Sequence, residues 1–312
     1  MRSRNGTASS VAAAGLDRRG TRRRSELVVA GALLACALVS VLTTVAVIAV
    51  LTAETVGFFR EVPLAEFFTN TRWTPLFLDQ NFGIAPLVSG TLLVTAIALV
   101  VGAPLGLGAA VYLSEFASET RRRRVIPVLE LLAGIPTVVL GYFALLFLTP
   151  VLRSFIPGVD LFNPLSAGIV MGFMILPTIS SISVDSMQAV PRSLREAGYG
   201  LGAAKHELIL RVVIPAALSG IVASLILAVS RAIGETMIVT LAAGQRPDLH
   251  FDPRQTIATM TSYIVQAATG DQPAGSLGAR SLYAVAATLF VMTLGLNLAA
   301  QAVVRRFEER YE

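Results

Sequence analysis

The chain has 312 residues, of which 54% are hydrophobic and only 14% are charged. Its mean hydropathy is +0.70, whereas a typical soluble domain has about 25% charged residues. These values exclude an ordinary soluble domain and predict a membrane protein. The net charge of +5 does not indicate nucleic-acid binding, because the basic residues lie between apolar runs without interleaved aromatic residues. A single cysteine, Cys36, and two histidines leave no metal site of the Cys/His type, so we expect neither metal nor cofactor.

The predicted elements begin with an N-terminal tail at 1–26, which is rich in Arg, Ser, Ala and Gly and lacks an apolar face. We expect this tail to be disordered. The uncharged run at 27–53 is longer than the 7 to ~15 apolar residues of a secretory signal, so it predicts a retained first transmembrane helix. Five more apolar runs follow, at 80–114, 131–152, 161–184, 212–230 (continuing past Glu235) and 281–304. The sequence therefore predicts an all-α membrane protein with six transmembrane helices.

The basic residues also predict the orientation of these helices. Most Lys and Arg residues lie in the N-terminal tail, in the loops around 121–124 and 192–211, and in the C-terminal tail at 306–312. The positive-inside rule then places both termini in the cytoplasm. An external loop is expected at 54–81, ahead of a five-helix core at 82–305. The aromatic residues of this loop suit an interfacial belt and a partly folded hairpin, and a second long external loop follows at 245–280.

Two pairs of glycines, Gly102 with Gly106 and Gly168 with Gly172, have the small-xxx-small spacing within predicted spans. Small residues at this spacing let helix backbones approach closely in membranes. We therefore predict close packing at these glycines and assign them no chemical role.

The most unusual charges are Arg231 and Glu235, which lie within the fifth apolar run. We expect one helix to run through both, so their four-residue spacing places them on one face, near the middle of the membrane. Charges at this depth are costly unless they are paired or hydrated, and they often mark a transport pathway. Two interpretations stay open: a buried ion pair that holds helices together, or an arginine that binds an anion in transit.

The loop at 187–214 predicts a helix-turn-helix between the fourth and fifth spans. Pro191 can begin a helix, Leu194, Ala197 and Leu201 follow at helical spacing, and the glycines near 200–202 break it. A helix-turn-helix can also bind DNA, but short tethers to two spans would prevent this one from reaching a groove. A protein docking surface is the favoured interpretation.

The same loop resembles a known motif. Glu196-Ala197-Gly198, three residues, Gly202, nine residues and then 212–215 (VVIP) resemble the EAA loop of ABC-importer permeases, with Gly198 in place of the usual Ala. More of the chain resembles the phosphate-specific permease subunits of the PstC type, in the segments 82–95 (FGIAPLVSGTLLVT), 104–117 (PLGLGAAVYLSEFA), 129–145 (LELLAGIPTVVLGYFAL), 176–191 (LPTISSISVDSMQAVP) and 230–239 (SRAIGETMIV).

This resemblance implies the ABC type I importer permease fold, in the cytoplasmic membrane of a bacterium. It implies a homologous permease partner of the PstA type, two copies of a cytoplasmic ATPase of the PstB type and an external phosphate-binding protein of the PstS type. The chain itself has no Gly-Lys dipeptide and hence no P-loop, so it is expected to be a transport subunit without enzymatic activity.

The residues and the resemblance together predict roles for particular positions. Coupling to the ATPase would fall to Leu194, Glu196, Ala197, Leu201 and Gly202, and translocation to Arg231, Glu235 and Thr137. The alternative to a translocation role for the Thr137 hydroxyl is a hydrogen bond to the backbone of its own helix. Two other functions stay open: an ATP-independent anion transporter or channel, and an ABC permease for another oxyanion such as sulfate.

Overall fold

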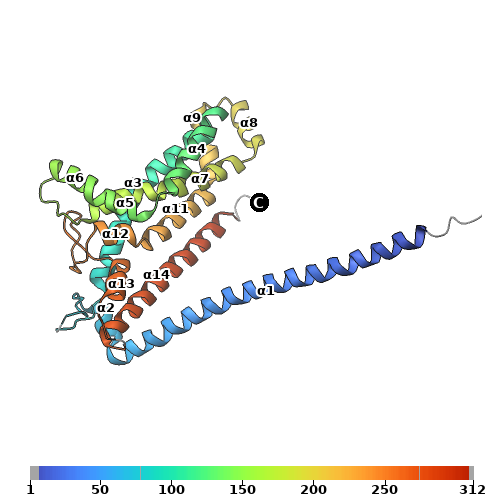
Figure 1. Cartoon of the computed structure of the whole chain (residues 1–312). Coiled ribbons are helices and arrows are strands. Elements are labelled where there is room, and N and C mark those ends of the chain that lie inside the picture. Colours follow the sequence, from blue (N-terminus) through green and yellow to red (C-terminus); the bar gives the residue numbers. More distant parts are fainter. Residues whose placement is uncertain (1–6, 78, 274, 309–312) are drawn as a thin grey trace, which may run out of the picture. The chain divides into compact units, whose positions relative to one another are not determined.

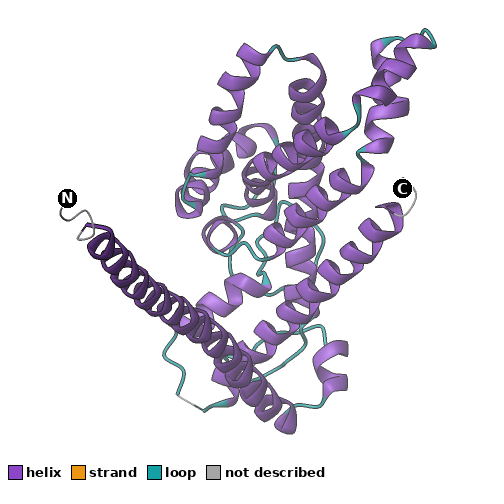
Figure 2. Cartoon of the chain, turned by 90° about the vertical axis from the view of Figure 1, so that its right-hand side faces the viewer, coloured by secondary structure: helices purple, strands orange, loops and turns teal. Residues whose placement is uncertain are grey.

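The computed structural model describes residues 7–77, 79–273 and 275–308, and side chains from residue 26 to 302 and at Val304, apart from positions 78 and 274. The described chain is helical apart from its loops and an antiparallel bridge between Trp73 and Phe82 (Figure 2). It divides into two compact units between Ala53 and Glu54. The prediction of an all-α protein is confirmed.

The long helix α1 begins at Thr7 and ends at Glu61 (Figure 1), and its part up to Ala53 is the described portion of the first unit. The structure describes residues 7–26 of the tail as the start of this helix, and residues 1–6 lie outside the described chain. Alanines before the apolar run favour helix, and an established helix gains one hydrogen bond per added residue. Every side chain from Glu26 to Val50 is exposed, which suits a helix that faces lipid.

The second unit contains the remaining spans. Four of its helical segments are long and apolar enough to cross a membrane, as is the 26–61 part of α1. A sixth candidate span is a pair of helices, Lys205–Ala216 and Leu218–Ile233, which pass the same test only together and are bent by 70° at the break between them. The helices are α2 (Leu64–Thr69), α3 (Ala85–Val111), α4 (Glu119–Ala133), α5 (Thr137–Phe143), α6 (Thr149–Phe155), α7 (Pro164–Ala189), α8 (Arg192–Gly200), α9 (Lys205–Leu208), α10 (Ile214–Ala216), α11 (Leu218–Ile233), α12 (Met237–Ala242), α13 (Met260–Thr269) and α14 (Leu277–Glu308).

Three short π-helical segments directly continue some of these helices. They are η1 (Tyr112–Phe116) after α3, η2 (Ala144–Leu148) between α5 and α6, and η3 (Ile209–Val213) between α9 and α10. Single-turn π segments inside α-helices often occur at functional sites. The segment η1 ends the second span, and its Glu115 contacts Arg195 of α8.

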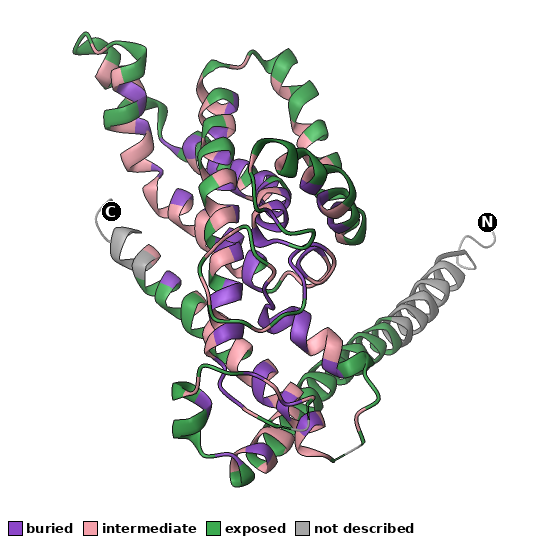
Figure 3. Cartoon of the chain, turned by 90° about the vertical axis from the view of Figure 1, so that its left-hand side faces the viewer, coloured by how far each residue is buried: buried purple, intermediate pink, exposed green. Residues whose placement is uncertain are grey.

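The core of the second unit is the contact between α3 and α7, two spans that lie side by side and run in the same direction. We call this contact the α3–α7 crossing. A Cβ atom added at Gly102 would lie 2.7 Å from the carbonyl oxygen of Gly172. One added at Gly168 would lie 2.7 Å from the Cβ of Ile97, and Gly106 is similarly crowded. The predicted close packing at these glycines is confirmed. Figure 3 shows the buried residues gathered in the interior of this unit.

The aromatic residues after the first span form a buried cluster. Trp73 is 1% exposed and packs edge-on against Tyr263, with ring centroids 5.0 Å apart. Phe58 and Phe67 are fully buried in the same cluster, together with Phe82. The interfacial belt predicted for this loop is therefore wrong for Trp73, Phe58 and Phe67, because the loop folds back through the Trp73–Phe82 bridge and supplies its own core. The predicted hairpin is confirmed.

Two span boundaries differ from the prediction. The third span is Thr137–Phe155, not 131–152, because the chain breaks between α4 and α5 at Gly134 and Pro136. A residue that precedes proline is disfavoured in the α conformation, which favours an end to α4 before Ile135 and Pro136. The fifth span does not continue as one helix past Glu235. The helix α11 ends at Ile233, and α12 begins separately at Met237.

Candidate functional site

The loop between α7 and α9 has the predicted helix-turn-helix form. α8 begins after Pro191 and ends at Gly200, and α9 begins at Lys205. Gly202 has φ +82°, a left-handed conformation that side chains with a Cβ disfavour. The amide N–H groups of Leu201 and Gly202 close the turn on the carbonyls of Ala197 and Tyr199. Gly202 is therefore required for the backbone path of this turn. We call residues 192–208 the coupling loop.

The outer face of α8 is open. Leu194 is 44% exposed and Leu201 is 89% exposed, and Ala197 and Glu196 are exposed as well. No residue of α8 is buried. Exposed apolar side chains at the spacing i, i+3 and i+7 form a continuous strip on one helix face. In Figure 1, α8 and α9 project together at one end of the second unit, with α2 at the opposite end.

The inner face of the coupling loop explains the departure from the EAA pattern at Gly198. A Cβ added there would overlap the Cδ1 atom of Leu208, which is 1% exposed. Leu208 belongs to a buried cluster with Met187 and Val213. Glycine at position 198 thus lets α8 lie directly on the leucine that anchors α9.

Arg195 was not among the predicted site residues, yet it makes the strongest polar contacts of the coupling loop. Its Nη1 atom donates to both carboxylate oxygens of Glu115, at 2.8 and 2.7 Å, and its Nη2 atom donates to the carbonyl oxygen of Met187 at 2.6 Å. The side chains of Arg195 and Glu115 are 21% and 6% exposed. One signal in the sequence could have indicated this contact, the acidic Glu115 at the end of an otherwise apolar span.

The second predicted site lies at the break between α11 and α12. Gly234 ends α11, and the Oε1 atom of Glu235 accepts hydrogen bonds from the backbone N–H groups of Met237 and Ile238, at 3.0 and 3.3 Å. The carbonyl of Glu235 accepts a hydrogen bond from Thr261 at 2.8 Å. Glu235 therefore caps the start of a new helix, α12, and the assumption that it shares a continuous helical face with Arg231 is wrong.

Arg231 lies in the last turn of α11 and is exposed, whereas Glu235 is half-buried. Within the part of the chain that the structure describes, no ion pair joins Arg231 to Glu235. The guanidinium also makes no hydrogen bond to any described residue. Because Glu235 neutralises the positive end of α12 instead, the chain leaves the charge of Arg231 available.

Thr137 is the first residue of α5 and is half-buried. Among the described residues it has no hydrogen-bond partner for its hydroxyl, so the expected bond to its own helix is not formed. α5 packs closely on α12, since a Cβ at Gly141 would lie 2.9 Å from Leu241 and 3.2 Å from the carbonyl oxygen of Met237. The helix that Thr137 begins is thus a neighbour of the helix that Glu235 caps.

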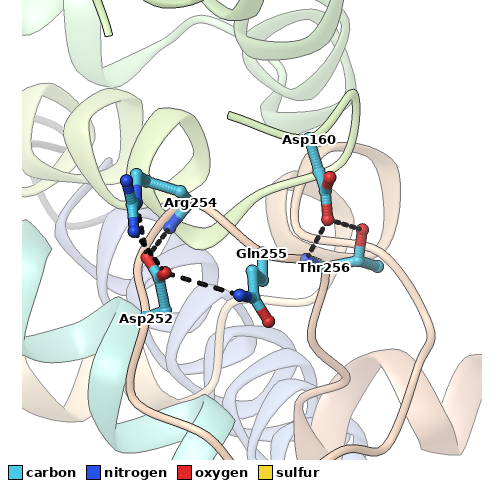
Figure 4. A network of polar contacts seen from close by, with 5 residues as sticks. All are labelled: Asp160, Asp252, Arg254, Gln255 and Thr256. Carbon is cyan, nitrogen blue, oxygen red and sulfur yellow. Dashed lines mark hydrogen bonds and ion pairs between the residues drawn. The ribbon is translucent and has the colours of Figure 1, made fainter. Parts of the chain in front are cut away.

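At the end opposite the coupling loop, two connecting loops are tied together by a polar network (Figure 4). Asp160, in the loop between α6 and α7, accepts a hydrogen bond from the backbone N–H of Thr256 at 3.0 Å. Asp252 accepts from the Nε and Nη2 atoms of Arg254, at 2.9 and 2.8 Å. These hydrogen bonds lower the pKa of Asp252 to about 2. The network holds its carboxylate ionised across the physiological range.

The fold and these two sites define a helical membrane protein of the transport-subunit class, with a broken span that presents a free arginine and a structured loop that presents an apolar strip. The chain belongs to the family of binding-protein-dependent transport system inner membrane components, which it matches over residues 102–312.

Individual relatives are similar over most of their length. The chain is 34% identical to the probable ABC transporter permease protein YqgH of Bacillus subtilis, over 83% of this chain and 84% of that protein. It is 34% identical to the phosphate transport system permease protein PstC of Mesorhizobium japonicum, over 78% and 79% of the two chains. The corresponding values for PstC 1 of Mycobacterium tuberculosis are 33%, 77% and 81%.

Solved structures confirm the fold. A bacterial ABC transporter involved in import of the polysaccharide alginate has a TM-score of 0.56 at 17% identity, covering 80% of this chain and 87% of that one. The MetNI methionine ABC transporter in an inward-facing conformation has a TM-score of 0.53 at 17% identity, covering 72% and 94%. The predicted ABC type I importer permease fold is thereby confirmed.

Proposed function

We propose that this chain is the permease subunit of an ATP-driven importer that carries inorganic phosphate across the membrane. The similarity to phosphate transport permeases over more than three quarters of the chain carries this proposal. Arg231 supports it chemically, because a guanidinium without a partner can replace the water around a phosphate oxygen pair with two charge-assisted hydrogen bonds.

The partners follow from the same proposal. A homologous permease completes the pathway, two copies of an ATPase bind the exposed strip of the coupling loop, and an external phosphate-binding protein delivers the anion at the opposite end. ATP hydrolysis belongs to the ATPase, since this chain has no P-loop. Both termini lie in the cytoplasm, in accord with the distribution of Lys and Arg.

The roles assigned to Arg231, Glu235 and Thr137 are part of the proposal. Arg231 binds the anion, Glu235 holds the break in the span open by capping α12, and the free hydroxyl of Thr137 is available to a phosphate oxygen. A transported ion must be bound weakly enough to leave again. One exposed arginine meets that requirement better than a buried cluster of cations would.

The decisive experiment is uptake of labelled phosphate, with labelled sulfate in parallel, by bacteria that lack this chain and then regain it. We expect phosphate uptake to return and sulfate uptake to be unchanged. If sulfate uptake returns and phosphate uptake does not, the transported anion is sulfate and not phosphate. Uptake that persists after the ATPase of the transporter is inactivated would instead favour an ATP-independent transporter.

A further inference from the structure

The coupling loop is attached to the membrane-spanning part of the chain at few points. α8 has no buried residue, so apolar packing cannot hold it in place. Its inner side rests on Leu208 of the same loop, and its first residue follows Pro191 at the end of α7. A movement imposed on α8 from outside would therefore be lost by local rotation unless a specific contact links α8 to the spans.

Arg195 provides that contact, and it reaches two spans at once. One guanidinium nitrogen bonds the carboxylate of Glu115 in η1, the end of the second span, and the other bonds the Met187 carbonyl in the last turns of α7. Glu115 is 6% exposed. Its Oε1 atom also accepts a hydrogen bond from the hydroxyl of Ser114 at 2.9 Å. The carboxylate is thus held on both sides.

The next residue of η1 contacts the other helix of the loop. The ammonium of Lys205, the first residue of α9, lies 4.6 Å from the centre of the Phe116 ring. A cation over an aromatic face is attracted by the ring, although less strongly than a paired charge. Two adjacent residues of η1, Glu115 and Phe116, therefore connect to both helices of the coupling loop.

The spans that Arg195 joins are those that can move as one body. α3 and α7 run parallel and meet at glycines on both helices, with backbone atoms in contact. By contrast, the route from α9 into α11 passes a 70° bend. A displacement of the loop reaches α3 and α7 through the Arg195 contacts more directly than it reaches α11 through the chain.

We propose that Arg195 is a positioning residue that transmits movement of the coupling loop to α3 and α7, through the clamp formed by Arg195, Glu115 and the Met187 carbonyl. This inference rests on the proposed function, since it assumes an ATPase that moves the loop. The clamp includes neither the exposed strip of Leu194, Ala197 and Leu201 nor Arg231. Its loss should separate ATP hydrolysis from transport without removing either partner.

The test uses the assembled transporter, with its sister permease, ATPase and binding protein, in proteoliposomes loaded with ATP. Glu115→Gln and Arg195→Gln break the charged pair with little change in size. Glu119→Gln is the matched control, because it removes a nearby pair with Arg123 of similar length, 2.6 Å, whose side chains are 78% and 77% exposed. The measured quantity is ATP hydrolysed per labelled phosphate imported, together with the amount of ATPase that co-purifies.

We expect Glu115→Gln and Arg195→Gln to retain the ATPase and its basal hydrolysis, while phosphate imported per ATP falls by about tenfold or more, since a broken buried pair leaves an uncompensated partner. Glu119→Gln should match the wild type. Arg195→Lys should lie between, because an ammonium keeps the charge but lacks the planar fork that reaches two acceptors. If the glutamine variants fail to assemble, Arg195→Lys is the variant that tests the proposal.

If the Arg195 and Glu115 variants import as much phosphate per ATP as the wild type, the proposal is overturned. Loss of the ATPase in proportion to uptake would overturn it too, because Arg195 would then serve docking. Labelled sulfate is run beside phosphate for every variant. If the wild type carries sulfate and not phosphate, the proposed substrate fails, whereas the ratio for sulfate still decides the role of Arg195.

Discussion

The α3–α7 crossing and the break between α11 and α12 use glycine in opposite ways. At the crossing, Gly102 and Gly172 remove side chains so that two long helices can touch along their backbones. At the break, Gly234 ends a helix, and Glu235 caps the next one. The first arrangement makes a rigid pair of spans, and the second opens the backbone within an apolar run, where polar groups can meet a substrate.

This difference separates the residues that hold the protein together from those that act. α7 is the most buried span, with 72% of its most apolar window buried, compared with 11% for the last span, 277–302. The charged and polar candidates for translocation lie outside that crossing, on the ends of α11, α12 and α5. Substitutions at the crossing should therefore affect assembly, and substitutions at the break should affect transport.

The largest effect is expected for Gly172→Val. The first added carbon would lie 2.8 Å from the Cβ of Val101 and 3.0 Å from the carbonyl oxygen of Ala98, so backbone must move. Overpacking of this kind costs about 3 kcal/mol or more where backbone is displaced. The yield of assembled transporter and its melting temperature should both fall strongly.

Gly108→Ala is the control for this substitution, because Gly108 lies in the same helix α3 and has no atom within 4 Å of an added Cβ. Alanine there should leave stability unchanged or raise it by up to about 1 kcal/mol through helix propensity. Equal losses at positions 172 and 108 would contradict the assignment of the crossing as the rigid pair.

The second largest effect is expected for Arg231→Gln, which should abolish phosphate uptake and leave assembly intact. The guanidinium has no partner among the described residues, so its removal leaves no buried charge uncompensated. Arg231→Lys should recover only part of the activity, because a point charge lacks the bidentate fork. The measurement is uptake of labelled phosphate beside co-purification of the sister permease.

The exchange of both charges sharpens this test. Arg231→Glu combined with Glu235→Arg would restore transport if the two residues served only as an ion pair. The structure predicts no recovery, because an arginine at 235 cannot accept the N–H groups of Met237 and Ile238. Recovery of uptake in the double variant would return Arg231 to a structural role.

A smaller effect is expected for Gly202→Val in the coupling loop. No atom lies within 4 Å of an added Cβ, so the cost arises from the left-handed backbone alone, about 1–2 kcal/mol. The turn should distort, and uptake should fall together with the amount of bound ATPase. Gly200→Ala is the control, since it is equally open and lacks a positive φ. Uptake that is unaffected by both substitutions would argue against docking through this loop.

The sequence predicted the helix-turn-helix, the number of apolar runs and the glycine crossing because each is a local pattern of spacing and composition. It did not predict the break at Gly234, because the four-residue spacing of Arg231 and Glu235 fits one helix equally well. It also missed Arg195, whose partner Glu115 is 80 residues away. Contacts between distant segments depend on how spans pack, and one chain's residue pattern contains no direct record of that.

The smallest effect concerns the network at the end opposite the coupling loop. Hydrogen bonds from Arg254, first from its side chain and then from its backbone N–H, lower the pKa of Asp252 from 3.8 to about 2. Because the pKa of Asp252 is lower in the folded state than in the unfolded state, the ionised carboxylate stabilises the fold. This stabilisation is fully present above pH 3.8 and is lost as the pH falls through about 2. Between pH 5 and 8 it is constant. Asp252→Asn should therefore lower the melting temperature slightly and by the same amount at both pH values.

The pair is exposed, so its contribution is small and falls with added salt. Arg254→Gln should have a smaller effect than Asp252→Asn, because the backbone N–H of residue 254 still donates to Asp252, and the double variant should lose little more than Asp252→Asn alone. If the difference in melting temperature between the wild type and Asp252→Asn is smaller at pH 5 than at pH 8, Asp252 titrates in this range. Its carboxylate would then lie outside the bidentate contact that joins it to Arg254.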